Sequence, residues 1–273
     1  MSGAPRWAVI GALLVVLAGV VWWMREELGA LSWLWEADKP SPLRVQRDEA
    51  NSLFDQAGAA FGQGRFEEAR ALYQRAAALY EEVLDEHNRA VALENLGLVE
   101  YNQRRYLEAD THYRQALTIY QRTRELDRSV AVYKQLGDNA RAMSRYEDAR
   151  RFYREARALI DPSGDRRMAA RVALAQGLTE DDLHALDAAA DFYTQAAALA
   201  ADASDPHLLG EIAQAMARVE QQRDRPEQAR ELLQNALAQY GAAGDLAAQA
   251  QVRETLMQLD AARRPASTVS PAR

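Results

Sequence analysis

Small and aromatic residues recur along this chain at intervals of forty positions. Alanine marks one position of each unit, and an aromatic residue, or leucine in the last unit, follows four residues later. The two series are Ala69, Ala109, Ala149, Ala189 and Ala229, and Tyr73, Tyr113, Tyr153, Tyr193 and Leu233. A unit that cannot bury its own apolar face has to stack on its neighbours. The pattern therefore predicts five stacked copies of one unit in a single elongated domain.

Within each unit, apolar residues are spaced by three and four positions, with no alternating pattern typical of strands. This spacing predicts a pair of amphipathic helices per unit and an all-α fold. A further amphipathic stretch at 245–263, with Leu246, Val252, Leu256 and Leu259, predicts a capping helix over the last unit. The expected helices are 44–62 and 66–85, 89–103 and 106–124, 128–143 and 146–160, 166–178 and 183–202, and 206–223 and 226–241.

Two of the units carry a specific motif. It is formed by Leu96, Gly97, Tyr106, Ala109, Tyr113 and Ala116, and again by Leu136, Gly137, Tyr146, Ala149, Tyr153 and Ala156. These residues resemble the tetratricopeptide repeat (TPR), in which small residues let two helices approach and aromatic residues fill the gap beside them. The period of 40 exceeds the 34 residues of the basic repeat. The terminal units depart further, with Ala57 and Ala217 at the glycine position. The resemblance implies a right-handed α-solenoid over residues 42–264.

The resemblance also implies a binding surface on the first helix of each pair. The positions that it places there include Phe54, Phe61, Glu94, Asn95, Leu98, Tyr101, Lys134, Arg141, Arg171 and Arg218. Three of these cations, Lys134, Arg141 and Arg171, form a hypothetical site for an acidic or C-terminal carboxylate group of a protein partner. The alternative is that they are ordinary solvated charges, neutralised in part by Asp138 and Glu94.

Residues 7–24 form an uncharged stretch of eighteen residues, WAVIGALLVVLAGVVWWM. Its length suits a membrane-spanning helix, and Trp7 at one end with Trp22 and Trp23 at the other suit the two headgroup levels. Small residues such as Gly11 and Ala18 leave a smooth surface for another transmembrane helix. A cleaved signal peptide is the alternative, but bulky residues follow the apolar stretch where small ones are usual. The sequence favours a retained anchor.

The segments around the anchor complete the domain organisation. Residues 1–6 are a short N-terminal tail, and we expect 265–273 to be a disordered tail. Residues 25–41 contain an apolar, aromatic stretch and a proline-bounded linker. That stretch fits an interfacial helix on the bilayer and an N-terminal cap on the first unit equally well. Cationic residues flank the anchor on both sides, so we expect N-in topology in a bacterial inner membrane, with a periplasmic solenoid, mainly because that is common for N-terminal anchors.

Composition excludes several functional classes. The net charge of −7 and the lack of a long basic run argue against nucleic acid binding. The absence of cysteine rules out disulfides, thiolate metal sites and a cysteine nucleophile. The four histidines are scattered, and no phosphate-binding loop or nucleophile elbow is present. The acidic pair Asp181 and Asp182 falls in an expected turn, where solvated carboxylates are usual. No metal, cofactor, small-molecule substrate or enzymatic activity is expected.

Two functional hypotheses follow. In the first, the chain is a membrane-anchored adaptor that binds a protein or peptide and holds it beside a membrane assembly, of the kind used in secretion, envelope assembly or cytochrome maturation. In the second, it is an integral structural subunit of a larger membrane complex. The anchor would raise the effective concentration of a partner in the same membrane.

Overall fold

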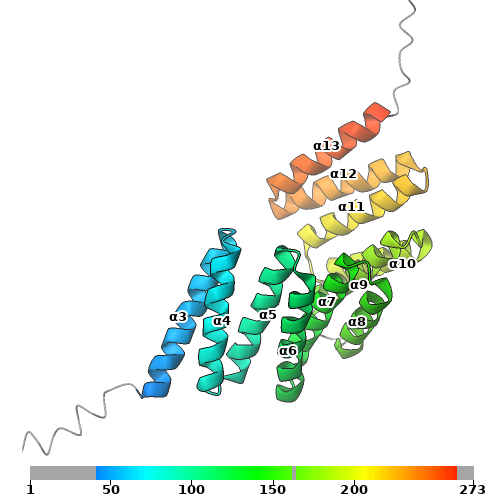
Figure 1. Ribbon diagram of the computed structural model, residues 1–273. Coiled ribbons are helices and arrows are strands. Elements are labelled where there is room, and N and C mark those ends of the chain that lie inside the picture. The colour runs from blue at the N-terminus through cyan, green and yellow to red at the C-terminus, as the bar shows by residue number, and fades with distance from the viewer. Residues whose placement is uncertain (1–40, 162–163, 263–273) are drawn as a thin grey trace, which may run out of the picture.

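A computed structural model describes residues 41–161 and 164–262 of the chain, which form eleven α-helices and contain no strand. The helices run side by side from one end of an elongated array to the other (Figure 1). They are α3 (Pro42–Gly62), α4 (Phe66–Glu82), α5 (Glu86–Asn102), α6 (Tyr106–Thr123), α7 (Leu126–Ala142), α8 (Tyr146–Leu159), α9 (Arg166–Asp182), α10 (Leu186–Asp202), α11 (Pro206–Gln222), α12 (Pro226–Ala243) and α13 (Leu246–Ala262).

Five helix pairs, from α3 with α4 to α11 with α12, make up the array. We call the leading helices of the pairs (α3, α5, α7, α9 and α11) the first helices, and their partners the second helices. The first helices α7, α9 and α11 contact one another directly, whereas neighbouring second helices lie further apart. The first helices therefore line the inner side of the curve. The expected all-helical, TPR-like solenoid is confirmed.

Glycine and tyrosine fix the closest approach within a pair. A Cβ atom added to Gly97, Gly137 or Gly177 would come closer than 3.0 Å to the ring of the tyrosine sixteen residues later. Each of these tyrosines is at most 1% exposed. Interiors packed this closely have no room for one more carbon atom without a shift of the ring or the helix. The small and aromatic positions of the motif therefore determine the spacing of the two helices.

Turns of a common type connect the helices. A residue with positive φ recurs every twenty positions from Gly64 to Gly244, including Arg104 and Asp224. The position at 164 is the exception within the described residues, because Gly164 does not have a positive φ. There α8 ends at Leu159 and α9 begins at Arg166, so the α8–α9 connection is longer than the others. The array is regular except at this connection.

The C-terminal helix α13 covers the last pair, as expected. Val252 is fully buried against α12, and Leu256 and Leu259 pack beside it. Leu246 does not belong to this lid, because it is 75% exposed at the first position of the helix. The prediction for that residue was wrong: the residues of α13 that pack on the last pair begin at Ala248.

Within 41–161 and 164–262, no helix is both long enough and apolar enough to cross a bilayer. The expected anchor at 7–24, with Trp7, Gly11, Ala18, Trp22 and Trp23, lies outside the described residues. So do the tails at 1–6 and 265–273 and the juxtamembrane segment up to residue 40.

Candidate functional site

The first-helix face at the N-terminal end is apolar and aromatic. Phe54, Phe61, Leu98 and Tyr101 are all half-buried. Three of them pack edge-to-face on aromatic rings of the second helices, with centroid distances of 5.2 Å for Phe54–Tyr73, 5.6 Å for Phe61–Phe66 and 5.7 Å for Tyr101–Tyr106. Each of these three rings is therefore partly exposed, while its contact with a second-helix ring fixes its position. A partner would meet preorganised aromatic side chains here.

Two polar residues of the predicted surface already have partners inside the protein. Glu94 is 9% exposed and accepts hydrogen bonds from Tyr120 Oη at 3.1 Å and Gln135 Nε2 at 2.9 Å. The Asn95 amide donates to the Val91 carbonyl at 2.8 Å. Glu94 thus joins α5 to its own second helix and to the next first helix. Its side chain is a structural link between units.

Three of the four predicted cations also form ion pairs within the face. Lys134 Nζ lies 2.6 Å from Asp138, and Arg141 Nη1 lies 2.8 Å from Asp182. Arg218 Nη2 lies 2.6 Å from Asp181. A ligand carboxylate would have to compete with these carboxylates for the guanidinium and ammonium groups. Arg171 is exposed and forms no ion pair with a described residue.

The acidic pair at the end of α9 was assigned wrongly from the sequence. Asp181 and Asp182 belong to the last turn of the helix, not to a solvated loop, and Asp181 is only 3% exposed. Asp181 accepts hydrogen bonds from Arg218 at 2.7 Å and Gln222 at 2.8 Å, both on α11. The pair thus links α9 to both neighbouring first helices, since Asp182 pairs with Arg141 on α7.

Two arginines and one tyrosine of this face have shifted pKa values. Burial acts to lower the pKa values of Arg141 and Arg218, but hydrogen bonds to Asp182 and Asp181 outweigh it, and both values are raised. Burial raises the pKa of the Tyr101 phenol, with a further contribution from Asp138. These shifts keep the two guanidinium groups charged and the Tyr101 phenol neutral near pH 7.

A second set of polar contacts joins successive units and was missed in the sequence. A basic residue near the start of one first helix pairs with the acidic residue just before the next first helix or, in the last case, before α13. The pairs are Arg47–Asp85 at 3.3 Å, His87–Glu125 at 2.7 Å, Arg167–Asp205 at 2.9 Å and His207–Asp245 at 3.1 Å. We call these the cap pairs. Aligning the five units would have revealed them, because the partners are always 38 positions apart.

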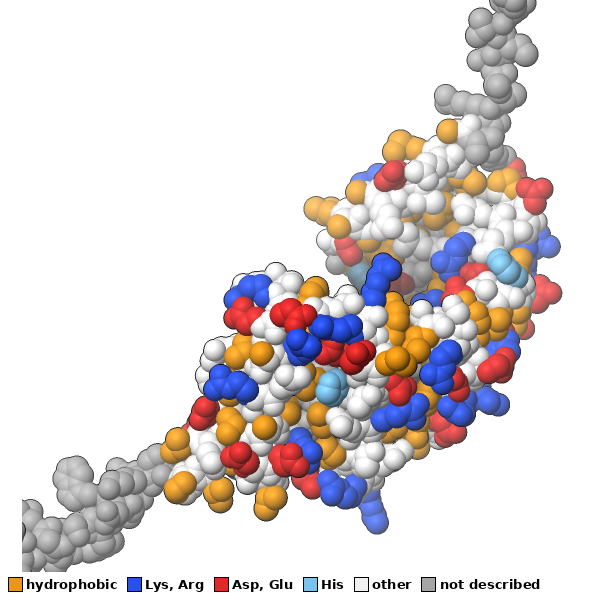
Figure 2. All heavy atoms as spheres, in the orientation of Figure 1, with side chains coloured by type: hydrophobic (Ala, Val, Ile, Leu, Met, Phe, Trp, Pro, Cys, Tyr) orange, Lys and Arg blue, Asp and Glu red, His pale blue; other side chains and the backbone are white. Residues whose placement is uncertain are grey.

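The third joint breaks this series, since the corresponding residues are Asp127 and Asp165. Both line a cavity of about 200 Å³ beside Ile160 and Met168. Elsewhere on the surface, cations and anions are interspersed and form no extended field of one sign on the face in Figure 2. In the described part of the chain, no three His, Asp or Glu side chains are grouped as metal ligands would be.

Together the helices and their packing define a class by fold: arrays of stacked helix pairs. Residues 48–122, which include most of α3 and all of α4 and α5, match the tetratricopeptide repeat family. The glycine–tyrosine contacts at Gly137 and Gly177 extend the same packing to two further units. No curated protein sequence matches the chain.

Solved structures share the fold. Aspartyl phosphate phosphatase F from Bacillus subtilis superposes with a TM-score of 0.73 and 17% identity over 82% of this chain and 62% of that one. The Rap conjugation gene regulator of plasmid pLS20, solved in complex with the Phr* peptide, gives a TM-score of 0.65 and 16% identity over 77% of this chain and 58% of that one. The chain thus spans roughly three fifths of the length of these two proteins. At such identities the likeness shows the fold alone.

Proposed function

We propose that this chain is a non-catalytic scaffold that binds a protein or peptide along its first-helix face. The single observation that carries the proposal is the row of half-buried Phe54, Phe61, Leu98 and Tyr101 on adjacent first helices. Partly exposed aromatic side chains held in place by packing are the usual anchors of protein interfaces. The Rap regulator solved with the Phr* peptide supports the proposal, because it has the same fold and binds a peptide.

The internal ion pairs refine which part of the face binds. Lys134, Arg141 and Arg218 are matched by carboxylates of the face itself. We therefore place the apolar anchors of the partner at the α3–α5 end. Asn95, Arg171 and the three paired cations form a polar rim that orients the partner and adds little binding free energy.

The test compares two variants of the full-length chain purified from its native host. Phe54→Ala with Tyr101→Ala removes two anchors and should abolish co-purification of the partner at unchanged helix content. Lys134→Glu with Arg141→Glu should weaken binding of an acidic partner less than tenfold, because both cations are already paired with carboxylates of the face. Retention of the partner by the aromatic double variant would refute the proposed face. A complete loss with the charge-reversal variant would restore the carboxylate site as the main determinant.

We further propose that residues 7–24 anchor this scaffold in a bacterial inner membrane, with the array on the periplasmic side. Eighteen uncharged residues with tryptophan at both ends support the anchor. A reporter fused after Arg273 that is active only in the periplasm would place the array. Activity of a cytoplasmic reporter at the same position would reverse the topology, and release of the chain by high salt without detergent would refute the anchor.

A structural subunit of a membrane complex is the second candidate. The smooth surface of Gly11 and Ala18 in the anchor favours it, because such helices pack on one another in membranes. Detergent extraction followed by size-exclusion chromatography and mass spectrometry separates the two functions. A subunit co-purifies at fixed stoichiometry at every concentration, whereas an adaptor dissociates on dilution.

A further inference from the structure

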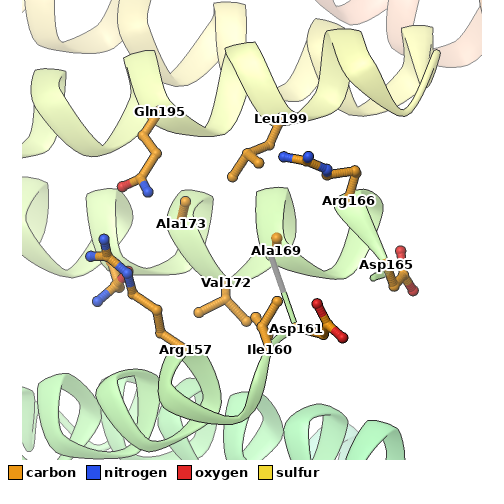
Figure 3. A pocket seen from close by; sticks show the side chains of 11 residues that line it. Arg157, Ile160, Asp161, Asp165, Arg166, Ala169, Val172, Ala173, Gln195 and Leu199 are labelled. Atoms are coloured by element: carbon orange, nitrogen blue, oxygen red, sulfur yellow. The ribbon is translucent and has the colours of Figure 1, made fainter. Parts of the chain in front are cut away.

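The second-helix side of the array contains a groove at the joint between the third and fourth units. It lies between α8 and α10 with α9 as its floor, and consists of two cavities of about 310 Å³ and 400 Å³ that share Arg157 and Gln176. In Figure 3, Gln195 and Leu199 point from α10 toward α9, while Arg157 and Ile160 come from α8 on the opposite side. The groove is therefore open and elongated.

Two unit positions at this joint hold different residues from those of the second unit. The first position holds a tyrosine in three units. These are Tyr80, Tyr120 and Tyr240, each at most 3% exposed. The third unit has Ile160 there, beyond the end of α8. Helix α8 has 14 residues, against 17 or 18 in the other second helices, and packs less extensively on the following first helix. The second position holds buried Leu117 in the second unit and Arg157 in the third.

A third replacement puts a buried amide into the core. Gln176 occupies the unit position of Leu96 and Leu136, which are both at most 1% exposed. The Gln176 side chain is itself only 7% exposed, and its Oε1 atom accepts no hydrogen bond from the described residues. Buried polar groups without partners are rare, because each loses its hydration without replacement. A glutamine at a leucine position that also lines a groove indicates a ligand contact.

Some charged side chains of the groove already form ion pairs, and others do not. Arg150 is held by Glu180 and by Glu147, and Asp165 caps α9 through the Met168 amide. These carboxylates are therefore already engaged. Arg154 and Arg157 line the groove beside them and form no ion pair with a described residue. Two guanidinium groups are thus available for an anion at the end of the groove away from Asp165.

We propose that this joint is a second binding groove, separate from the first-helix face, which holds an extended peptide segment with an acidic side chain next to an apolar one. A primary amide both donates and accepts, which matches the main chain of a peptide. The Gln176 Oε1 atom accepts from a peptide N–H, and the guanidinium groups of Arg154 and Arg157 bind the carboxylate. Val172 and Leu199 receive the apolar side chain.

The experiment uses the full-length chain in detergent and two pools of end-blocked, fluorescein-labelled heptapeptides. One pool alternates Asp or Glu with Leu or Ile, and the other has Lys or Arg in place of the acids. Fluorescence polarisation should show at least tenfold tighter binding of the acidic pool. Arg154→Glu with Arg157→Glu should abolish that binding. Equal affinity for the two pools, or no binding of either, would overturn the proposal.

Gln176→Leu is the decisive variant, since it restores the residue found in the second and third units. This variant should raise the melting temperature and weaken binding of the acidic pool at least fivefold. A higher melting temperature at unchanged affinity would show that Gln176 is only a core defect, and would overturn its assigned role.

Two controls locate the binding. Arg75→Glu with Arg122→Glu reverses the same number of charges on α4 and α6, and should leave the affinity within twofold. Phe54→Ala with Tyr101→Ala should also leave it unchanged. Loss of the acidic pool in the aromatic variant would place the peptide on the first-helix face and refute the second groove, whereas failure of the pool to bind leaves the scaffold function untouched.

Discussion

The α6–α7 joint and the α8–α9 joint are made from the same unit positions but carry different residues there. In the first, Tyr120 and Leu136 are fully buried and do not line the cavity beside them. In the second, Ile160 and Gln176 stand at those positions, and both line a cavity of about 310 Å³. The two joints differ at a few side chains, while the glycine–tyrosine packing continues on both sides. A repeat array can therefore change the residues that line a local groove without losing its overall geometry.

The comparison also distinguishes contacts within a helix pair from contacts between pairs. Contacts within a pair, such as Gly137 with Tyr153 and Gly177 with Tyr193, are the same on both sides of the irregular joint. Contacts between pairs vary, as the cap pairs show by their interruption at Asp127 and Asp165. Stability in such arrays is a sum of terms within and between units. In this chain, the contacts between units differ from joint to joint, whereas the glycine–tyrosine contacts within pairs stay the same.

Copying the glutamine of the α8–α9 joint into the α6–α7 joint should have the largest effect. Leu136→Gln replaces a fully buried leucine with an amide that has no partner, and should lower the free energy of unfolding by about 4 kcal/mol through lost burial and an unpaired polar group. Urea unfolding followed by circular dichroism measures the change. Leu136→Met, which keeps the volume, should cost less than about 1.5 kcal/mol. Equal effects of the two variants would mean that the α6–α7 joint is not tightly packed.

The glycine–tyrosine contact, which is present in the pairs on both sides of the α8–α9 joint, provides the next test. Gly137→Ala pushes a methyl group into the Tyr153 ring and should cost about 2 kcal/mol. Gly177→Ala should cost the same against Tyr193 if the irregular joint leaves the pairs intact. Gly62→Ala is the control, because a Cβ there meets nothing within 4 Å. A much smaller cost for Gly177→Ala would show that the looser packing of the α8–α9 joint extends into the fourth pair.

Restoring the missing cap pair should have a smaller effect. Asp127→Arg places a cation opposite Asp165 and should raise the free energy of unfolding by less than about 1 kcal/mol, as expected of exposed ion pairs. The gain should shrink in 1 M salt because screening weakens such pairs. Asp127→Asn removes only the repulsion between the two acids and should give part of the gain. No change from either variant would mean that the two side chains do not interact.

The last cap pair should show the smallest effect, as a dependence on pH. Hydrogen bonding from the Ala248 amide, followed by His207, lowers the pKa of the Asp245 carboxyl in spite of its partial burial. A folded pKa below the unfolded value of about 3.9 means that the carboxylate stabilises the fold above that pH and ceases to do so as pH falls through the folded pKa. The difference in melting temperature between the wild type and Asp245→Asn should therefore begin to shrink near pH 4 and continue to shrink as pH falls through the folded pKa. A constant difference from pH 3 to pH 7 would contradict this.

The sequence predicted the pairs better than their connections. Local spacing was sufficient for the helices, and the motif at Gly97 and Tyr113 identified the close contact, because both depend on residues within one unit. Asp181 was misplaced since its burial depends on Arg218 and Gln222, which are 37 and 41 positions away on another helix. Gln176 occupies the position of Leu96 and Leu136, a departure that the sequence analysis did not use. That Gln176 lines a groove depends on side chains of α8 and α10, which local spacing does not bring together, although the end of α8 was predicted within one residue.

The long connection between α8 and α9 has a consequence for how the molecule comes apart. Helices α3 to α8 and α9 to α13 are each continuous stacks, joined across an interface with fewer contacts than its neighbours. Linear arrays unfold by breaking at their weakest nearest-neighbour interface. We therefore expect two cooperative blocks, so that amide hydrogen exchange under mild denaturant exposes one block while the other stays protected.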